Sequence, residues 1–314
     1  MRQDQHNNID NLPYHTPALL DEAINALAIL PDGIYADATF GGGGHSRAIV
    51  DRLGPDGHLY GFDQDIDAYS NTIDDPRFTF VRSNFRYMPN FMEFYGVDRL
   101  DGILADLGVS FHHFDEASRG FTFRDDSAPL DMRMNRDAAI TAAEILNNDS
   151  QDELATMFRL GSDLKNCGRL AAAIVKARQN APLTTSADLR SAIGNAINPK
   201  NEKKDLAQIY QALRIRVNHE IDALSDFLNN SLRLLAPGGR LAVITYHSLE
   251  DRLVKNFMKA GNLEGDVEQD FFGNVKSPWR LVTRQPITPS AEEIERNPRS
   301  RSAKLRIAEK IADI

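Results

Sequence analysis

The sequence predicts an α/β protein built on a mostly parallel sheet, with an all-helical region inserted into it. From Gly33 to about residue 107, strand-like apolar runs alternate with helical patterns over short connections. Helical spacing alone then continues from residue 153 to 235, and strand-like runs return after it. Carboxylates close two of the early strands, at Asp63 and Asp106. Because the carboxyl ends of parallel strands meet at one edge of a sheet, both acids are expected at one ligand-binding crevice.

The first strand-like run leads into a glycine-rich turn. Gly41 to Gly44 are four consecutive glycines, and a helical pattern begins directly after them. Glycine allows positive φ and close approach of a ligand to the main chain, and the first N–H groups of a helix are free to bind it. Strand, glycine turn and helix in this order are typical of a nucleotide site, with Asp63 placed to bind ribose hydroxyls.

Enzymes that use NAD and enzymes that use S-adenosylmethionine both contain such a turn. Counted from Gly41, the third glycine of the NAD fingerprint would stand at position 46, where this chain has Ser46. Asp37 precedes the first glycine by four residues, as is common in methyltransferases. The two positions favour S-adenosylmethionine, and an NAD-dependent oxidoreductase is the less favoured alternative. A merely flexible glycine loop seldom lies between a strand and a helix.

The expected elements of the first part follow this alternation. Strands are expected at residues 33–40, 58–63, 78–82 and 100–106, with helices at 45–53, 66–73 and 87–95. From about His113 to Asn135 the pattern loses its period. The aromatic and methionine content of this stretch predicts an ordered loop that packs on the protein.

The second part is helical before it returns to strands. Helices are expected at residues 153–160, 164–179 and 186–197, the last with a capping signal at Thr185. An apolar stripe in steps of three and four residues runs from Leu206 to Leu235, which is typical of helical packing on a core. A stop signal at residues 236–239 ends it. A fifth strand at 240–246, a helix from Ser248 and strands at 279–284 and 304–308 complete the expected elements.

Composition limits the possible classes. The 314 residues, 42% of them hydrophobic, suffice for one large domain and a smaller one. No apolar run approaches the ~20 residues of a membrane span and the N-terminus lacks a signal-peptide core, so a cytoplasmic protein without membrane contact is expected. The single cysteine, Cys167, excludes a disulfide framework and a multi-cysteine zinc site, and no metal site is predicted.

The net charge of −9 argues against a general nucleic-acid binder but leaves local basic faces possible. One basic cluster lies at helical spacing in the inserted region and consists of Lys165, Arg169, Lys176 and Arg178. In another, Arg299 and Arg301 alternate with small serines just before the last expected strand. A charge run is usually only a solvated face. Even so, Arg299, Arg301, Lys165 and Arg169 are candidate nucleic-acid contacts.

With these stretches in place, the chain resembles the bacterial 16S ribosomal RNA cytosine-N4 methyltransferase family from His15 to about Lys310. The resemblance rests on residues 37–46, 106–110, 119–123, 129–134, 246–252 and 297–302. It implies a class I methyltransferase (Rossmann-like) fold with an inserted helical subdomain, and S-adenosylmethionine as methyl donor. It also implies a cytidine in the decoding region of 16S rRNA as acceptor, within an assembled or nearly assembled small ribosomal subunit. Oligomeric state is left open.

The resemblance also implies boundaries and contacts. Residues 1–115 and 218–314 are expected to form the methyltransferase domain, and residues 116–217 the loop and helical insertion. The family's cofactor contacts fall on Gly43, Gly44, His45, Asp63, Phe85 and Asp106, to which the glycine turn adds Gly41 and Asp37. His113 stands where the family usually has a glutamine, and its ring nitrogens can still make a hydrogen bond to the cofactor.

Methyl transfer to an exocyclic amine depends mainly on holding the amine in line, roughly 3 Å from the methyl carbon. Asp106 is expected to be a cofactor ligand first and a catalytic acceptor of the amine N–H second. His247, just past the fifth strand, is the other catalytic candidate, and a hydrogen bond to the local turn is its equal alternative. No strong general base is required, because the amine loses its proton easily once it is cationic.

Two further functions remain alternatives. A DNA cytosine-N4 methyltransferase would use the same chemistry, but the expected Asp-Pro-Pro loop and target-recognition domain are missing from the sequence. An RNA-binding or assembly factor that only retains the fold is disfavoured by the intact Asp37, glycine turn, Asp63 and Asp106.

Overall fold

The computed structural model describes residues 17–108, 116–269, 271–273 and 275–311. Its centre is a seven-stranded sheet in the order β3-β2-β1-β4-β5-β9-β8. The strands β1 to β5 run parallel, while β9 is antiparallel to both of its neighbours. This mostly parallel sheet confirms the predicted fold class. The strands are β1 (Ile34–Asp37), β2 (His58–Asp63), β3 (Phe78–Arg82), β4 (Leu100–Asp106), β5 (Leu235–Thr245), β8 (Trp279–Leu281) and β9 (Lys304–Lys310).

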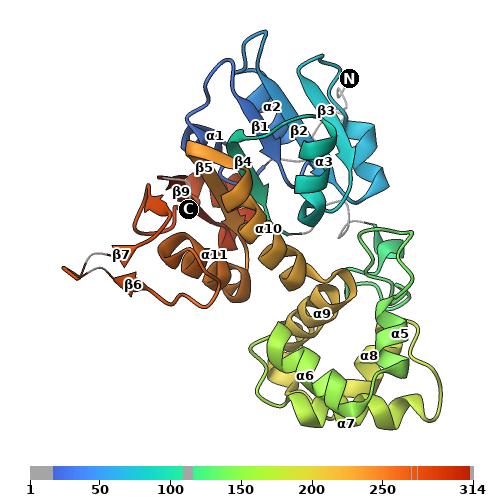
Figure 1. Cartoon of the computed structure of the whole chain (residues 1–314). Coiled ribbons are helices and arrows are strands. Elements are labelled where there is room, and N and C mark those ends of the chain that lie inside the picture. Colours follow the sequence, from blue (N-terminus) through green and yellow to red (C-terminus); the bar gives the residue numbers. More distant parts are fainter. Residues whose placement is uncertain (1–16, 109–115, 270, 274, 312–314) are drawn as a thin grey trace, which may run out of the picture.

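Helices cover both faces of the sheet (Figure 1). Successive strand residues point to opposite faces, so Ile103 belongs to one buried core and Leu104 to another. The Ile103 core includes apolar residues of α3, α10 and α11, and the Leu104 core those of α1 and α2. The helices are α1 (Leu20–Leu27), α2 (Gly44–Val50), α3 (Met88–Phe94), α10 (Glu220–Leu234), α11 (Ser248–Ala260) and α12 (Ala291–Arg296), with short 3₁₀ turns η1 (Ile66–Asn71), η2 (Phe85–Tyr87) and η5 (Pro298–Ser302).

A third core lies entirely between residues 121 and 217 and is built by helices that gather below the sheet in Figure 1. Three of these helices begin with reciprocal capping boxes, one of them at the predicted Thr185. The separate core supports the proposed division into residues 1–115, 116–217 and 218–314. Its elements are α5 (Ala142–Asn148), α6 (Gln151–Gly161), α7 (Cys167–Arg178), α8 (Ser186–Ile193) and α9 (Glu202–Asn218), with the 3₁₀ turns η3 (Ala117–Arg119) and η4 (Pro199–Asn201).

The apolar stripe from Leu206 to Leu235 turns out to serve two cores. The helix breaks at His219, whose φ of 51° ends α9 and starts α10. Leu213 lies in the helical core, whereas Leu224 lies in the Ile103 core, which packs against the sheet. A left-handed residue at a helix end is usually glycine or asparagine, so the histidine gave no stop signal. The short α5 was also missed.

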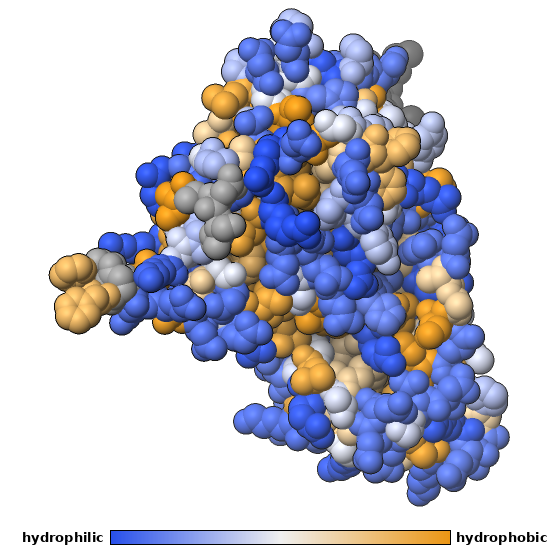
Figure 2. All heavy atoms as spheres, viewed as in Figure 1, coloured by the Kyte–Doolittle hydropathy of each residue, from blue (hydrophilic) through white to orange (hydrophobic). Residues whose placement is uncertain are grey.

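A short hairpin, β6 (Glu268–Gln269) and β7 (Val275–Lys276), was not predicted either. It projects from the body in Figure 1, and the apolar spheres at its tip are visible in Figure 2. Phe271 and Phe272 are 98% and 84% exposed there. Across the described residues, no helix is both long and apolar enough to cross a membrane.

The separate helical core leads to a prediction about local stability. Phe158 on α6 is fully buried in that core. Phe158→Ala should lower the free energy of unfolding of the helical part by about 3–5 kcal/mol, because it leaves a cavity. Hydrogen exchange should then rise in residues 142–217 before it rises in β1 to β5. Phe257 lies in the Ile103 core against the sheet. In the matched variant Phe257→Ala, exchange should therefore rise in the strands before it rises in residues 142–217. Equal loss of protection in both parts would contradict separate units.

Candidate active site

A pocket of about 500 Å³ opens at the carboxyl ends of β1, β2 and β4, and this volume is usual for a small-molecule site. Its lining comes from the sheet, from the loop at residues 121–124, from α9 and from η5. Of the residues predicted for the site, it contains Gly41, Gly44, His45, Asp63, Phe85, Asp106 and Arg299. Asp37, Gly43 and His247 are not among the lining residues, and His113 lies outside the described residues.

Close packing explains the glycines at the start of α2. Gly43 has a φ of 74°, and a Cβ added there would lie 2.4 Å from Nη1 of Arg47. A Cβ at Gly44 would lie 2.3 Å from Cγ of Pro17. A side chain at either position would displace these neighbours and, at Gly43, strain the backbone. Gly43 therefore shapes the turn without lining the pocket.

Asp37 and Ser46, the two positions that favoured S-adenosylmethionine, form a hydrogen bond with each other. The Ser46 hydroxyl donates to Oδ2 of Asp37 at 2.6 Å, and the N–H of Thr39 donates to Oδ1 at 3.1 Å. Both side chains are buried. Burial raises the pKa of Asp37, and these hydrogen bonds oppose the rise. Asp37 thus ties the end of β1 to α2 and supports the turn from behind.

Asp63 joins the end of β2 to the glycine turn. Its Oδ2 accepts the N–H of Gly41 and its Oδ1 accepts the N–H of Asp65, both at 2.8 Å. Burial raises the pKa of Asp63 to about 6, although both N–H groups favour the carboxylate. The carboxylate is held in a fixed orientation at the pocket wall, where a ligand with hydroxyl groups can bind it.

Asp106 is paired with Tyr246, a residue that sequence reasoning missed. The Tyr246 hydroxyl donates to Oδ1 of Asp106 at 2.8 Å, while Nδ1 of His45 lies 3.8 Å from Oδ2. Burial raises the pKa of Asp106 to about 7, the tyrosine hydrogen bond lowers it, and Asp37 and Glu250 add to the rise. The signal available in the sequence was a tyrosine at the end of the fifth strand.

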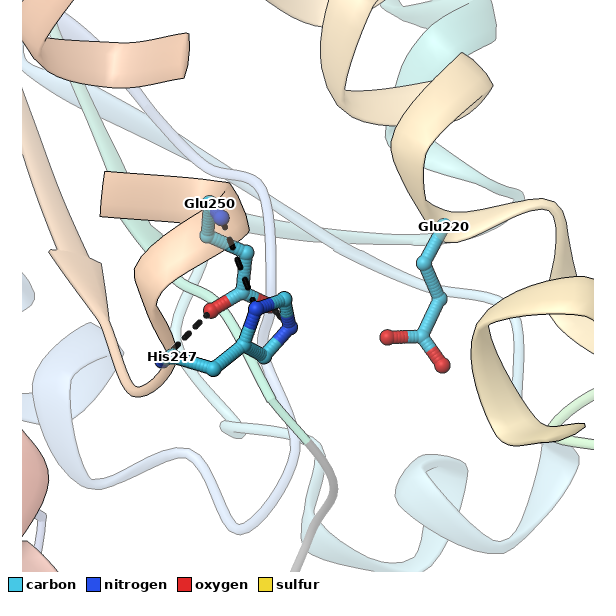
Figure 3. A group of neighbouring side chains, drawn as sticks. All are labelled: Glu220, His247 and Glu250. Carbon is cyan, nitrogen blue, oxygen red and sulfur yellow. Dashed lines mark hydrogen bonds and ion pairs between the residues drawn. The ribbon is translucent and has the colours of Figure 1, made fainter. Parts of the chain in front are cut away.

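His247 is the N-cap residue of α11. This agrees with the alternative that His247 makes a hydrogen bond to the local turn. Its Nδ1 accepts the N–H of Glu250 at 3.4 Å, and its Nε2 lies 2.9 Å from Oε1 of Glu250 (Figure 3). Oε2 of Glu250 accepts the N–H of Tyr246 at 3.0 Å. A catalytic role for His247 stays a hypothesis without a pocket contact to support it.

Glu220, His247 and Glu250 place possible metal-ligand atoms within 4.8 Å of one another. However, Arg214 already neutralises Glu220, with Nε 2.8 Å from Oε1 and Nη2 2.9 Å from Oε2. Of these two contacts, the one from Nη2 to Oε2 is a hydrogen bond. Because Arg214 also lines the pocket, we assign this cluster to holding the pocket wall between α10 and α11.

The other basic residues lie apart from the pocket lining. Lys165, Arg169 and Lys176 are exposed, the last two on α7, while Arg178 donates to the carbonyl of Leu146 at 2.8 Å. In Figure 1, α7 lies at the end of the helical part that is far from the sheet. Arg301 is exposed beside the pocket residue Arg299.

The loop that sequence analysis left without a role supplies a wall of the pocket. Phe121, Thr122, Phe123 and Arg124 line it together with Met134. The Phe123 ring packs edge-on against Tyr210, with ring centroids 5.4 Å apart. Apolar rings therefore lie in the same pocket as Asp63 and Asp106.

Comparison with known proteins identifies the family. Residues 13–311 match the model of the MraW methylase family. "Ribosomal RNA small subunit methyltransferase H" of Parabacteroides distasonis is 60% identical over 95% of this chain and 98% of its own. The protein of the same name from Phocaeicola vulgatus is 57% identical over 95% and 97%.

Among solved structures, a putative rRNA methylase from Clostridium thermocellum covers 95% of this chain and 100% of its own, at 13% identity and a TM-score of 0.44. The family match and the close relatives confirm the resemblance found in the sequence, and with it S-adenosylmethionine as the cofactor. The chain therefore belongs to the MraW methylase family of methyltransferases.

Proposed function

We propose that this protein transfers a methyl group from S-adenosylmethionine to the exocyclic N4 of a cytidine in the decoding region of 16S rRNA. The substrate is the small ribosomal subunit, in the cytoplasm. The name of the close relatives supports ribosomal RNA of that subunit as the target. One observation carries the chemistry: Asp63, Asp106 and the aromatic residues Phe121 and Phe123 line a single pocket.

The cofactor half of the pocket is assigned to the sheet. Asp63 is placed to accept the ribose hydroxyls, because backbone N–H groups fix both of its oxygens. Gly41, where a side chain is absent and no close neighbour fills the space, leaves room for the ligand beside the start of α2. Phe85, whose ring packs edge-on against Phe227 at 5.2 Å, offers an apolar surface for the adenine. When bound here, S-adenosylmethionine supplies an electrophilic methyl group on its sulfonium.

The acceptor half is assigned to Asp106 and the loop. The lone pair of the cytosine amine is delocalised into the ring, so an acceptor on its N–H helps the nitrogen to become pyramidal. Tyr246 occupies Oδ1 of Asp106, which leaves Oδ2 as that acceptor. With a pKa of about 7, Asp106 can also take the proton that the methylated amine loses and pass it to water.

Phe121 and Phe123 are assigned to the base itself. Aromatic side chains stack on unpaired bases, and a base must leave its own stack to reach a pocket of this kind. Phe121 is buried and Phe123 is partly exposed. The wall that they form would hold the cytosine ring while Asp106 orients its amine.

Small subunits from cells that lack this protein provide the direct test. They are incubated with isotope-labelled S-adenosylmethionine, and the rRNA is digested and analysed by mass spectrometry. We expect labelled N4-methylcytidine in a decoding-region fragment. Label on C5 or on a ribose oxygen would refute the proposed acceptor. Binding to subunits without transfer would favour the assembly-factor alternative, and transfer to duplex DNA would favour the DNA enzyme.

Replacing Asp63 tests the cofactor assignment. Asp63→Ala should weaken S-adenosylmethionine binding by about 1–3 kcal/mol through lost charge-assisted hydrogen bonds. Wild-type affinity should also fall as the pH drops through about 6, where Asp63 becomes protonated. Calorimetry measures both effects. Asp75→Ala, which removes an ion pair with Arg77 beside β3, is the control and should keep the affinity. An unchanged Asp63→Ala affinity would remove this residue from the site.

Asp106→Asn should separate stability from activity. The pKa of Asp106 is about 7 in the folded protein against an ordinary value of 3.8. The folded protein therefore holds a proton that the unfolded chain has lost between these values, and the stability this proton provides declines as pH rises through this window. Asp106→Asn should raise the Tm relative to the wild type at about pH 8 more than at about pH 5, and slow methyl transfer. An equal change in Tm at the two pH values would contradict the raised pKa.

The basic residues are tested in pairs. Arg299→Ala with Arg301→Ala should slow single-turnover methylation of the small subunit far more than it weakens cofactor binding, because these arginines would contact RNA phosphates near the pocket. Lys165→Ala with Arg169→Ala should instead lower subunit affinity and flatten its salt dependence. Wild-type rates and affinities in the first pair would mean that Arg299 and Arg301 are ordinary surface charges.

A further inference from the structure

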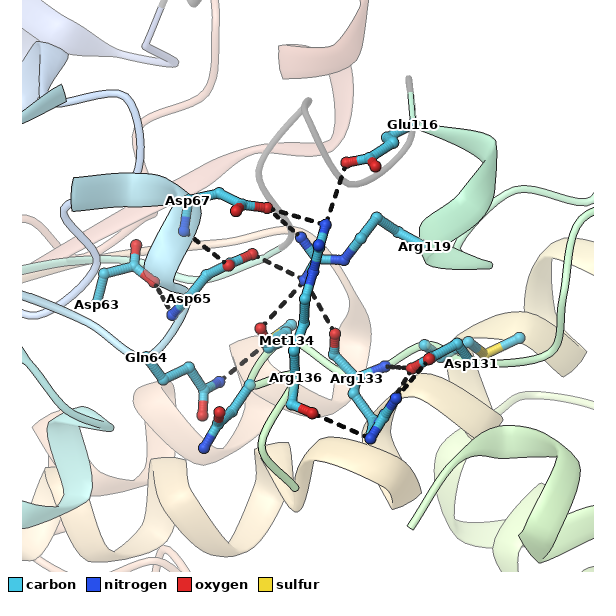
Figure 4. A network of polar contacts seen from close by, with 12 residues as sticks. Asp63, Gln64, Asp65, Asp67, Glu116, Arg119, Asp131, Arg133, Met134 and Arg136 are labelled. Atoms are coloured by element: carbon cyan, nitrogen blue, oxygen red, sulfur yellow. Dashed lines mark hydrogen bonds and ion pairs between the residues drawn. The ribbon is translucent and has the colours of Figure 1, made fainter. Parts of the chain in front are cut away.

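Arg119 is a buried cation that the proposed function leaves unexplained. Its side chain is 4% exposed, and its Nη1 and Nη2 lie 2.8 Å from carboxylate oxygens of Asp67 and Asp65, respectively. Nη2 also donates to the carbonyls of Arg133 at 3.0 Å and Met134 at 3.1 Å (Figure 4). The guanidinium thus fastens the segment after β2 to the loop before α5.

On one side, the contacts of Arg119 lead to the cofactor half of the pocket. Asp65, which Arg119 binds, donates its N–H to Oδ1 of Asp63. The Asp63 carboxylate also accepts the N–H of Gly41 in the glycine turn. Asp67 donates its N–H to Oδ1 of Asp65 at 3.1 Å. Because three carboxylates are crowded into five residues here, the positive charge of Arg119 offsets their repulsion and keeps Asp63 in place.

On the other side, the contacts of Arg119 lead to the aromatic wall. Its carbonyl accepts the N–H of Met132 at 3.0 Å. The next residue, Gly120, has a φ of 76°, and a Cβ there would lie 2.2 Å from the carbonyl oxygen of Pro129. Phe121 follows directly and lines the pocket. The orientation of this wall therefore depends on the segment that Arg119 anchors.

Met134 belongs to the same set of contacts. It lines the pocket, its carbonyl binds Arg119, and its Sδ accepts a hydrogen bond from Gln64 at 3.2 Å. Gln64 is the residue between Asp63 and Asp65. The segment after β2 and the loop are thus joined by Arg119, by the neutral contact of Gln64 with Met134, and by Arg136, whose Nη2 lies 3.2 Å from Oδ2 of Asp67 (Figure 4).

We propose that Arg119 is a positioning residue that couples the two halves of the pocket, so that a ligand on Asp63 favours the docked aromatic wall. This proposal rests on the proposed function. A ligand that holds Asp63 in its observed orientation favours the state in which Asp65 and Arg119 are engaged, and hence the state with the wall in place. By reciprocity, bound cofactor should tighten the binding of RNA, and bound RNA should tighten the binding of the cofactor by the same factor.

The first measurement needs no RNA. Hydrogen exchange in residues 116–134 is followed in the full chain with and without S-adenosylhomocysteine, the demethylated product. In the wild type, the ligand should slow exchange in this loop. In Arg119→Lys, which keeps the charge but loses the two-point contact, the protection should be lost while the ligand still binds at saturating concentration. Equal protection in Arg119→Lys and the wild type would overturn the proposal.

The second measurement uses small subunits. Their affinity is measured with and without S-adenosylhomocysteine, and typical couplings predict an increase of about 5-fold or more in the wild type. Arg119→Lys should reduce the increase to nearly none. Subunit binding that the ligand leaves unchanged in the wild type would also overturn the proposal. If the protein fails to bind subunits at all, the proposed function fails, and loop protection still decides the role of Arg119.

Arg133→Met is the matched control. Arg133 lies in the same loop and makes a two-point contact with Asp131, with Nε and Nη2 each 2.8 Å from a carboxylate oxygen. Among the described residues, the Arg133 side chain forms hydrogen bonds only with Asp131 and with the carbonyls of Arg136 and Ala138, all within the loop. Arg133→Met should keep the ligand-dependent protection and the coupling, even where its Tm falls. Equal loss of both in Arg133→Met and Arg119→Lys would make Arg119 a residue of general stability and overturn the proposal.

Discussion

Buried and half-buried carboxylates at the carboxyl edge of the sheet set the conditions that the rest of the structure must meet. Asp37, Asp63 and Asp106 each end a parallel strand. Desolvation raises the pKa of all three, and the charge of Asp37 adds to the rise at Asp63 and Asp106. Burying a charge is costly unless it is hydrogen-bonded. Each acid accordingly has its own donor: a serine hydroxyl for the first, backbone N–H groups for the second, a tyrosine hydroxyl for the third.

The helical insertion completes the pocket rather than adding a remote domain. The loop that leads into it supplies the aromatic wall, and Arg214 on α9 reaches the same lining. A buried ion pair gives little net stability on its own, because desolvation offsets the attraction. The contacts of Arg119 and Arg214 are therefore better understood as fixing geometry. The contacts of Arg119 hold segments distant in sequence together, and the ion pair of Arg214 with Glu220 fixes the junction of α9 and α10.

Local patterns predicted most of the sheet. The ends of β2, β3 and β4 were placed correctly, because a buried run that stops at a polar residue carries its own boundary. Asp63 and Asp106 followed from those ends. Tyr246 and Arg119 did not, because each acts through a partner far away in sequence: Tyr246 through Asp106, and Arg119 through Asp65. No periodicity encodes such pairings. The break at His219 was hidden because the apolar spacing continues across it.

The pairing of β4 with β5 constrains the order in which the chain can be assembled. The two strands are neighbours in the sheet, yet residues 107–234 lie between them. During synthesis β4 emerges from the ribosome long before β5. One edge of the partly formed sheet therefore stays unpaired and able to pair with other chains. An insertion with a core of its own can collapse first and bring the two ends of this long connection together. The helical part would then protect the nascent chain from aggregation before it contributes anything to catalysis.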